Sequence, residues 1–226
     1  WGLFVALGII FGTFFAVRRG TKRGIGRSVI VDVVFLATFA ALIGAKLAFS
    51  VFNRQVGVSG FSSIGAIIGG VISLLIFAKM KKISVFYLMD IFGPPLLLVE
   101  GIGRIGCFIL HEHLGKVTSF ILGVNVFGQT RHDLGLYFSL VAFVGVLLVL
   151  LTEKVMKNKK VGTIGLVTIV WYFGWRFALE FLLENSGPLV VWRIYNLTIM
   201  QIFSVIVFAV AAYLYVSKPV VSEDGD

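Results

Sequence analysis

The sequence predicts an all-α integral membrane protein with about seven transmembrane helices and an extracytoplasmic head segment. Of its 226 residues, 58% are hydrophobic and only 14% are charged. The mean hydropathy of the chain is +1.01. A water-soluble domain of this size could not bury so much apolar surface in one core, so lipid must surround much of it. We expect residues 1–226 to form a single polytopic membrane domain.

The spans are predicted in order from the apolar runs, because a helix needs about 20 mostly apolar residues to cross the hydrocarbon core. These runs are 1–17, 28–52, 61–78, 84–108, 136–152, 163–183 and 199–216. Gly8 and Gly12 in the first run, and Gly65 and Gly69 in the third, are spaced four apart and predict close helix packing. The chain has no clear internal repeat.

Two connections between spans are long and polar, 109–135 and 184–198. The first lies between spans four and five and contains all three histidines, His111, His113 and His132. Within span four, Pro94 and Pro95 predict a kink or a break.

The basic residues predict the orientation, because cytoplasmic loops carry the excess of lysine and arginine. Thirteen basic residues lie in the loops 18–27, 79–83 and 153–162 and after the last span, against four in the alternate loops. We therefore expect an extracytoplasmic amino terminus, a cytoplasmic carboxyl terminus and an extracytoplasmic 109–135 segment in the cell membrane. The net charge of +9 follows from this topology, so nucleic acid is not expected as a partner.

Two arginines lie inside apolar runs, where an unpaired charge costs at least about 2.5 kcal/mol at the bilayer centre. Glu100 precedes Arg104 by one helical turn, while Tyr172, Arg176 and Glu180 form one stripe. Two guanidiniums meeting toward the outer leaflet would suit a phosphate, and a lipid headgroup is the phosphate most available there. The alternative is two separate salt bridges that only lock helices together.

Three other motifs give weaker evidence about function. Gly101, Gly103 and Gly106 spell G-x-G-x-x-G, but a dinucleotide site requires a preceding strand and a βαβ unit. Cys107 is the single cysteine, which excludes an intrachain disulfide framework; it is interpreted as a small buried hydrophobe or, less favoured, a nucleophile. The three histidines are too loosely spaced to predict a metal site.

Around Arg104 the sequence resembles the prolipoprotein diacylglyceryl transferases, whose signature is Gly-Arg-x-Gly-Asn-Phe-x-Asn-x-Glu-x-x-Gly. This chain reads Gly103-Arg104-Ile105-Gly106-Cys107-Phe108-Ile109-Leu110-His111-Glu112-His113-Leu114-Gly115. Further matches follow in the same order: Gly44-Ala45-Lys46-Leu47, Arg131-His132, Leu136-Tyr137, Tyr172, Arg176-Phe177, Glu180-Phe181, Leu197-Thr198 and Gln201. The similarity extends over nearly the whole chain.

The chain also departs from that family. Ile64 stands where the family has a histidine, and Cys107 and Leu110 replace two asparagines. Gly135 and Phe138 replace the glutamine and glutamate that flank Leu-Tyr in the family. The arginines are kept, so the resemblance is to a divergent member.

The resemblance implies transfer of a diacylglyceryl group from phosphatidylglycerol to the lipobox cysteine of a prolipoprotein signal peptide, with release of glycerol phosphate. It needs no metal or organic cofactor. Arg104 and Arg176 would hold the phosphate, and Glu112 and Tyr172 would orient them or the glycerol. His132 is the best substitute for the missing family histidine, ahead of His111 and His113. Substrate contacts are expected from Gly103, Glu112, Gly115, Arg131, Tyr137, Glu180 and Gln201.

Two other functions remain open. The lost polar residues would suit a non-catalytic homologue that binds lipid or a lipoprotein precursor. Charged residues within spans would suit a small transporter, although the sequence lacks the inverted repeat common in that class.

Overall fold

A computed structural model describes residues 2–53, 60–126, 128–156, 160–184 and 193–217. Its helices are α1 (Gly2–Lys22), α2 (Arg27–Asn53), α3 (Ser63–Lys81), α4 (Val85–Ile109), α5 (Leu134–Val155), α6 (Thr163–Leu179) and α7 (Ile199–Ser217), with the short 3-10 helix η1 (Glu180–Leu182) after α6. In the described chain these seven α-helices, the sixth extended by η1, are long and apolar enough to span a membrane. The predicted fold class is confirmed. Several helices run past the predicted spans, because the basic residues at their ends are helical too.

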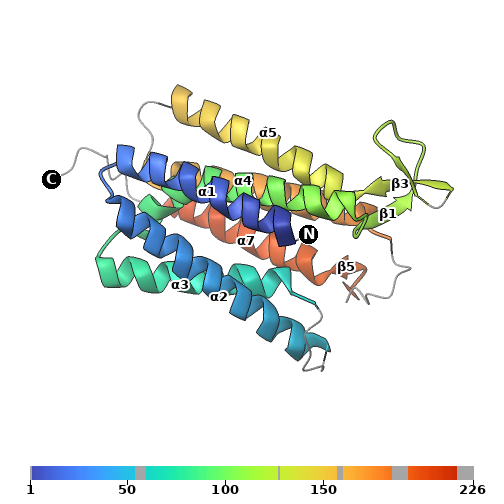
Figure 1. Ribbon diagram of the computed structural model, residues 1–226, viewed down its shortest axis with the longest axis horizontal. Helices are drawn as coiled ribbons and strands as arrows, with labels where there is room; N and C mark the ends of the chain where they lie inside the picture. Colours follow the sequence, from blue (N-terminus) through green and yellow to red (C-terminus); the bar gives the residue numbers. More distant parts are fainter. Residues whose placement is uncertain (1, 54–59, 127, 157–159, 185–192, 218–226) are drawn as a thin grey trace.

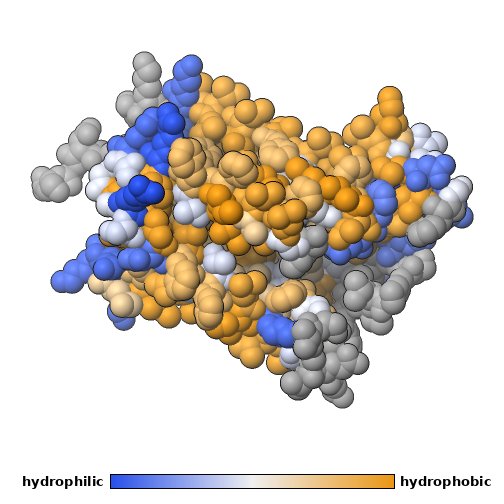
Figure 2. Space-filling model, in the orientation of Figure 1, coloured by the Kyte–Doolittle hydropathy of each residue, from blue (hydrophilic) through white to orange (hydrophobic). Residues whose placement is uncertain are grey.

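Helix α4 is central in the bundle and packs against α1, α5 and α6 (Figure 1). Helices α2 and α3 pack mainly against each other at one side, and α7 packs along α6. Hydrophobic residues cover the face in Figure 2 between two ends where hydrophilic residues gather. Large apolar side chains such as Phe14 and Phe39 are more than half exposed, as expected for helices whose solvent is lipid.

The predicted glycine pairs lie at close helix contacts. A Cβ on Gly65 would overlap the carbonyl oxygen of Gly44 in α2, and one on Gly69 would overlap that of Ala40. A Cβ on Gly12 would overlap the side chain of Val99 in α4. Small residues thus let these helix backbones approach each other closely.

Helix α4 continues through Pro94 and Pro95, so of the predicted kink or break, the break does not occur. Prolines lack the N–H that would bond to the carbonyl four residues earlier, here those of Asp90 and Ile91. Arg19 of α1 replaces both donors: its Nη2 lies 2.9 Å from the oxygen of Asp90 and its Nε lies 3.2 Å from that of Ile91. A neighbouring helix therefore supplies the hydrogen bonds that the prolines remove.

The carboxylate of Asp90 fastens α4 to the start of α6. It accepts hydrogen bonds from the backbone N–H groups of Gly162, at 2.6 Å, and Gly165, at 2.8 Å. Asp90 is 1% exposed, so both bonds are shielded from water. A carboxylate at a helix amino terminus also opposes the positive end of the helix dipole. Asp90 therefore has a structural role, which is to hold α4 and α6 together.

The segment between α4 and α5 folds as a small antiparallel sheet of three strands in the order β1-β3-β2, which we call the head. Its strands are β1 (Leu114–Val117), β2 (Val124–Val126) and β3 (Gln129–Asp133). A second pair, β4 (Arg193–Ile194) and β5 (Leu197–Thr198), precedes α7 at the same end of the bundle (Figure 1). The sequence did not predict these strands, which are too short to show a strand pattern.

Candidate functional site

Arg104 projects from the last two turns of α4, near the head. Its Nε donates to the Oε1 of Glu100 at 2.7 Å, one helical turn earlier. The side chain of Arg104 is only 11% exposed and that of Glu100 is 26% exposed. The pair predicted from the four-residue spacing is therefore present.

Arg176 lies in the last turn of α6 and pairs with Glu180 in η1, with an Nη2 to Oε1 distance of 2.9 Å. Both side chains are buried. Within the described residues, the Nε and Nη1 of Arg176 are buried without any hydrogen-bond partner. Leaving such donors unpaired costs about 1–3 kcal/mol or more, so these atoms point to an acceptor that binds there.

The two arginines meet on one aromatic ring. The guanidinium carbon of Arg104 lies 5.0 Å from the ring centroid of Phe138 in α5, and that of Arg176 lies 4.6 Å from it. Their guanidinium carbons are thus no more than about 10 Å apart, and both guanidiniums act electrostatically on Glu100. The salt-bridge alternative holds in part, since each arginine has its own carboxylate, but the two pairs are not separate.

Phe138 also affects the charge around the two arginines. It stands where the resembled family has a glutamate, so no carboxylate at this position of α5 neutralises the arginines. An aromatic face stabilises a guanidinium without cancelling its charge. Phe138 therefore adds no third carboxylate to Glu100 and Glu180, and the unpaired nitrogens of Arg176 can still donate to an anion.

Tyr172 lies one turn before Arg176 on α6 and interacts electrostatically with Glu100, Arg104 and Arg176. A phenol among these groups can donate to a carboxylate or to a bound headgroup oxygen. Of the stripe inferred from the sequence, Tyr172 therefore faces Arg104 across the α4–α6 contact, and Glu180 pairs with Arg176.

His113, in the turn after α4, is a histidine whose pKa is affected by the charges of this cluster. Burial and the charges of Arg104 and Arg176, opposed by Glu100, lower the pKa of His113 to about 4. The imidazole is therefore neutral at neutral pH. His113 was ranked below His132 in the sequence analysis, since only His132 matches a family histidine.

His132 lies in β3 with different neighbours. Its Nδ1 is 2.8 Å from the hydroxyl of Tyr137, and its ring packs against Phe120 and Tyr137. Burial and the nearby charge of Lys116 lower the pKa of His132. None of these contacts is with Arg104 or Arg176, so the structure does not bring His132 and the arginine pair together.

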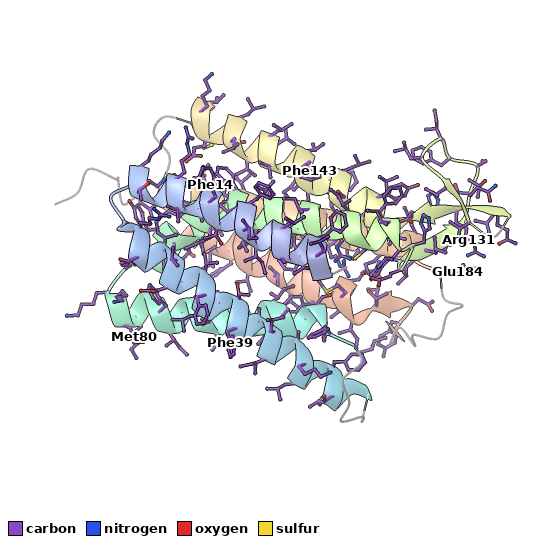
Figure 3. All side chains as sticks on the ribbon, in the orientation of Figure 1. Phe14, Phe39, Met80, Arg131, Phe143 and Glu184 are labelled. Atoms are coloured by element: carbon purple, nitrogen blue, oxygen red, sulfur yellow. The ribbon has the colours of Figure 1, made fainter. Side chains whose placement is uncertain are left out.

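Arg131 and Gly115, two expected substrate contacts, join the head to the end of η1. Arg131 forms an ion pair with Glu184 (Figure 3) and donates to the carbonyl of Gly115 at 3.3 Å. A Cβ on Gly115 would lie 2.5 Å from the carbonyl oxygen of Leu182. Arg131 and Gly115 therefore stabilise the contact between the head and the chain that follows α6.

Gln201 and Gly103 also make structural contacts. The Oε1 of Gln201 accepts from the N–H of Thr198 at 2.9 Å, the Oγ1 of Thr198 accepts from the N–H of Gln201 at 3.0 Å, and the Nε2 of Gln201 reaches the carbonyl of Phe177. This reciprocal cap begins α7 and ties it to α6 beside Arg176. A Cβ on Gly103 would come nearest to Val5 of α1, at 3.9 Å.

An apolar cleft of about 610 Å³ lies between α6 and α7, and its wall includes Trp171, Gly174, Ala178 and Phe208. At 100° per residue, the α6 residues of this wall face away from Arg176. The cleft is therefore separate from the arginine pair.

The fold and the site define a multi-pass membrane protein with a buried pair of arginines where the bundle meets its head. The family model for prolipoprotein diacylglyceryl transferase matches residues 1–217, and the chain belongs to this family. A phosphatidylglycerol–prolipoprotein diacylglyceryl transferase of Bacillus licheniformis is 32% identical, covering 95% of this chain and 86% of the relative. One of Staphylococcus aureus (strain MSSA476) is 29% identical, covering 96% and 84%.

Proposed function

We propose that the protein transfers the diacylglyceryl group of phosphatidylglycerol to the lipobox cysteine of a prolipoprotein, releasing glycerol phosphate. The supporting observation is the convergence of Arg104 and Arg176 on Phe138, with two nitrogens of Arg176 buried and unpaired. Family membership and the names of the relatives agree with this reaction.

The reaction is a displacement at carbon. A thiolate attacks the glyceryl carbon that carries the phosphate ester, a carbon–sulfur bond forms, and the carbon–oxygen bond breaks. The departing phosphate takes the electron pair and gains negative charge. Fixed positive charge in a water-poor site lowers the barrier to such a step, and Arg104 and Arg176 would supply it.

The remaining residues are assigned roles around that phosphate. Glu100 and Glu180 hold the two guanidiniums in place, at 2.7 and 2.9 Å. Tyr172 would orient a guanidinium or a glycerol hydroxyl, and Glu112 would contact the glycerol. His132 contacts Tyr137 in the head and not the arginines, so any role of His132 in the reaction would be exerted away from the phosphate.

We further propose that the head faces the extracytoplasmic side of the cell membrane and that the carboxyl terminus is cytoplasmic. The basic loops support this orientation. Because Cys107 is the single native cysteine and is buried, a cysteine placed at the exposed Ser119 of the head can be labelled selectively. A membrane-impermeant maleimide should label Ser119→Cys in intact cells, and should not label a cysteine placed at Lys81.

The activity test uses purified protein in detergent, phosphatidylglycerol labelled in its acyl chains, and a peptide with a lipobox cysteine. Label should appear on the peptide thiol. Arg104→Ala and Arg176→Ala should each lower the rate about 100-fold or more, as removal of one charge-stabilising donor does. The matched control is Arg27→Ala, an exposed arginine at the start of α2, which should keep its activity. An active wild type whose two site variants stay fully active would refute the assignment.

The non-catalytic alternative gives a different result in the same assay. Such a protein would bind phosphatidylglycerol, and lose that binding in Arg176→Ala, without moving label to the peptide. A transporter would pass solute in a liposome flux assay, which we expect to be negative.

A further inference from the structure

Cys107, Glu112 and His113 bring a thiol, a carboxylate and an imidazole together at the head end of α4. One ligand atom from each residue lies within 4.8 Å of the other two. Sequence spacing did not reveal this group, because residues five and six positions apart converge only if the chain turns sharply after the helix.

The backbone makes that turn. The N–H of Glu112 donates to the carbonyl of Cys107 at 3.1 Å, which closes the end of α4. His111 has a left-handed φ of 49°, which reverses the chain direction. The N–H of Leu134 donates to the carbonyl of His113 at 3.0 Å, so the start of α5 holds the turn in place.

His113 shows that the group is suited to a ligand. Its Nδ1 is buried and has no hydrogen-bond partner among the described residues. Cys107 is 3% exposed, whereas Glu112 is exposed. The three side chains thus form one cluster, which is buried at Cys107 and reaches the surface at Glu112.

We propose that Cys107, Glu112 and His113 bind a divalent metal ion of the zinc class through Sγ, a carboxylate oxygen and the imidazole. Thiolate, imidazole and carboxylate are the ligands that zinc prefers, and three protein ligands with one open position are typical of its catalytic sites. In a tetrahedral zinc site the ligand atoms are roughly 3.3–3.8 Å apart. The side chains need to close by about an ångström from their present separations.

The charge balance of the surroundings permits a cation. Arg104 and Arg176 act electrostatically on His113, and alone they would oppose a metal ion. Each is paired with a carboxylate, Glu100 at 2.7 Å and Glu180 at 2.9 Å, which offsets part of this repulsion. With Cys107 as thiolate and Glu112 ionised, the charges of the two ligands equal that of a divalent ion.

This inference rests on the proposed function where it concerns the reaction. The open position would bind the sulfur of the acceptor cysteine, whose proton passes to solvent as the metal thiolate forms. That thiolate then attacks the glyceryl carbon, and the phosphate held by the arginines leaves with the electron pair. In a chain where Ile64 replaces the family histidine, metal binding would thus generate the nucleophile, and Glu112 would then bind the metal ion in place of the glycerol.

The test measures metal content first. The purified full chain is incubated with zinc sulfate, desalted and analysed by inductively coupled plasma mass spectrometry. We expect about one zinc per chain, and about a tenfold or greater loss in Cys107→Ser and His113→Ala. His132→Gln is the matched control, a histidine of the head outside the group, and should retain zinc. Cobalt should give a thiolate charge-transfer band that Cys107→Ser lacks.

Folding is checked by size-exclusion chromatography and by the thermal transition, which zinc should raise in the wild type and not in Cys107→Ser. A folded wild type that retains no zinc overturns the site, as do variants that bind zinc like the wild type. If zinc binds but transfer persists after chelation, the site stands and its role in activating the thiol is wrong. If zinc binds and no transfer occurs under any condition, the proposed function fails and the metal site does not.

Discussion

The guanidinium carbon of Arg176 lies 4.6 Å from the ring centroid of Phe138, and the same ring also supports Arg104. Each cation–π contact contributes about 0.5–2 kcal/mol, more where water is excluded. Phe138→Leu removes both contacts while keeping an apolar residue. We expect kcat/KM for phosphatidylglycerol to fall about 10-fold.

The control for that change is Phe143→Leu, another phenylalanine of α5, which packs near Gly101 of α4. It should alter stability without altering kcat/KM. If the two variants lose activity equally, the ring of Phe138 has no special relation to the arginines.

Arg19 should matter for stability because Pro94 and Pro95 are present. Arg19→Met removes the donors for two carbonyls of α4 and leaves Glu153, its ion-pair partner at 2.7 Å, with one fewer cation. We expect the free energy of unfolding in detergent to fall by about 2–4 kcal/mol.

A double-mutant cycle tests that explanation. In a Pro94→Ala, Pro95→Ala background the helix supplies its own N–H groups, so Arg19→Met should cost about 1 kcal/mol less. Equal costs in the two backgrounds would show that Arg19 acts only through Glu153.

Gly65 and Gly70 in α3 should respond in opposite ways to alanine. At Gly65 a Cβ would overlap the backbone of Gly44, so Gly65→Ala should push α2 and α3 apart and lower the thermal transition. At Gly70 the nearest atom is 4.0 Å away, on Ala41, so Gly70→Ala should stabilise the helix by up to about 1 kcal/mol. Similar shifts would contradict the close approach of the two helices.

Stability should depend on His132 in mild acid. Burial and Lys116 lower its pKa in the folded state below the ordinary value. Neutral His132 therefore contributes stability that is present above about pH 6.5 and is lost as the pH falls through the folded pKa. His132→Gln should reduce the slope of thermal stability between about pH 7 and pH 5, and His113, whose pKa is lowered to about 4, should account for the slope that remains. An unchanged slope would assign the dependence to another group.

The sequence predicted the spans well because their lengths and apolar content are set by the bilayer. It also predicted the arginine pairs with Glu100 and Glu180, since residues one turn apart share a helix face. Continuity of α4 through its prolines could not be predicted, because it depends on Arg19, which lies over 70 residues away in the chain.

The site was only partly predictable for a related reason. Arg104 and Arg176 could be singled out one at a time, but their meeting on Phe138 depends on how α4, α5 and α6 pack. His113 was undervalued because its position relative to Cys107 follows from the left-handed turn at His111. Contacts between residues of one helix could be predicted from their spacing, and contacts between separate elements could not.

Asp90 has a consequence for how the protein is made. Its backbone partners, Gly162 and Gly165, are synthesised more than 70 residues after it. A ribosome that has delivered α4 to the insertion machinery has not yet produced the amides that this carboxylate will accept from. We therefore expect α4 to stay incompletely packed until the sixth helix enters the membrane, and a nascent chain truncated before that helix to be a preferred substrate for membrane quality-control proteases.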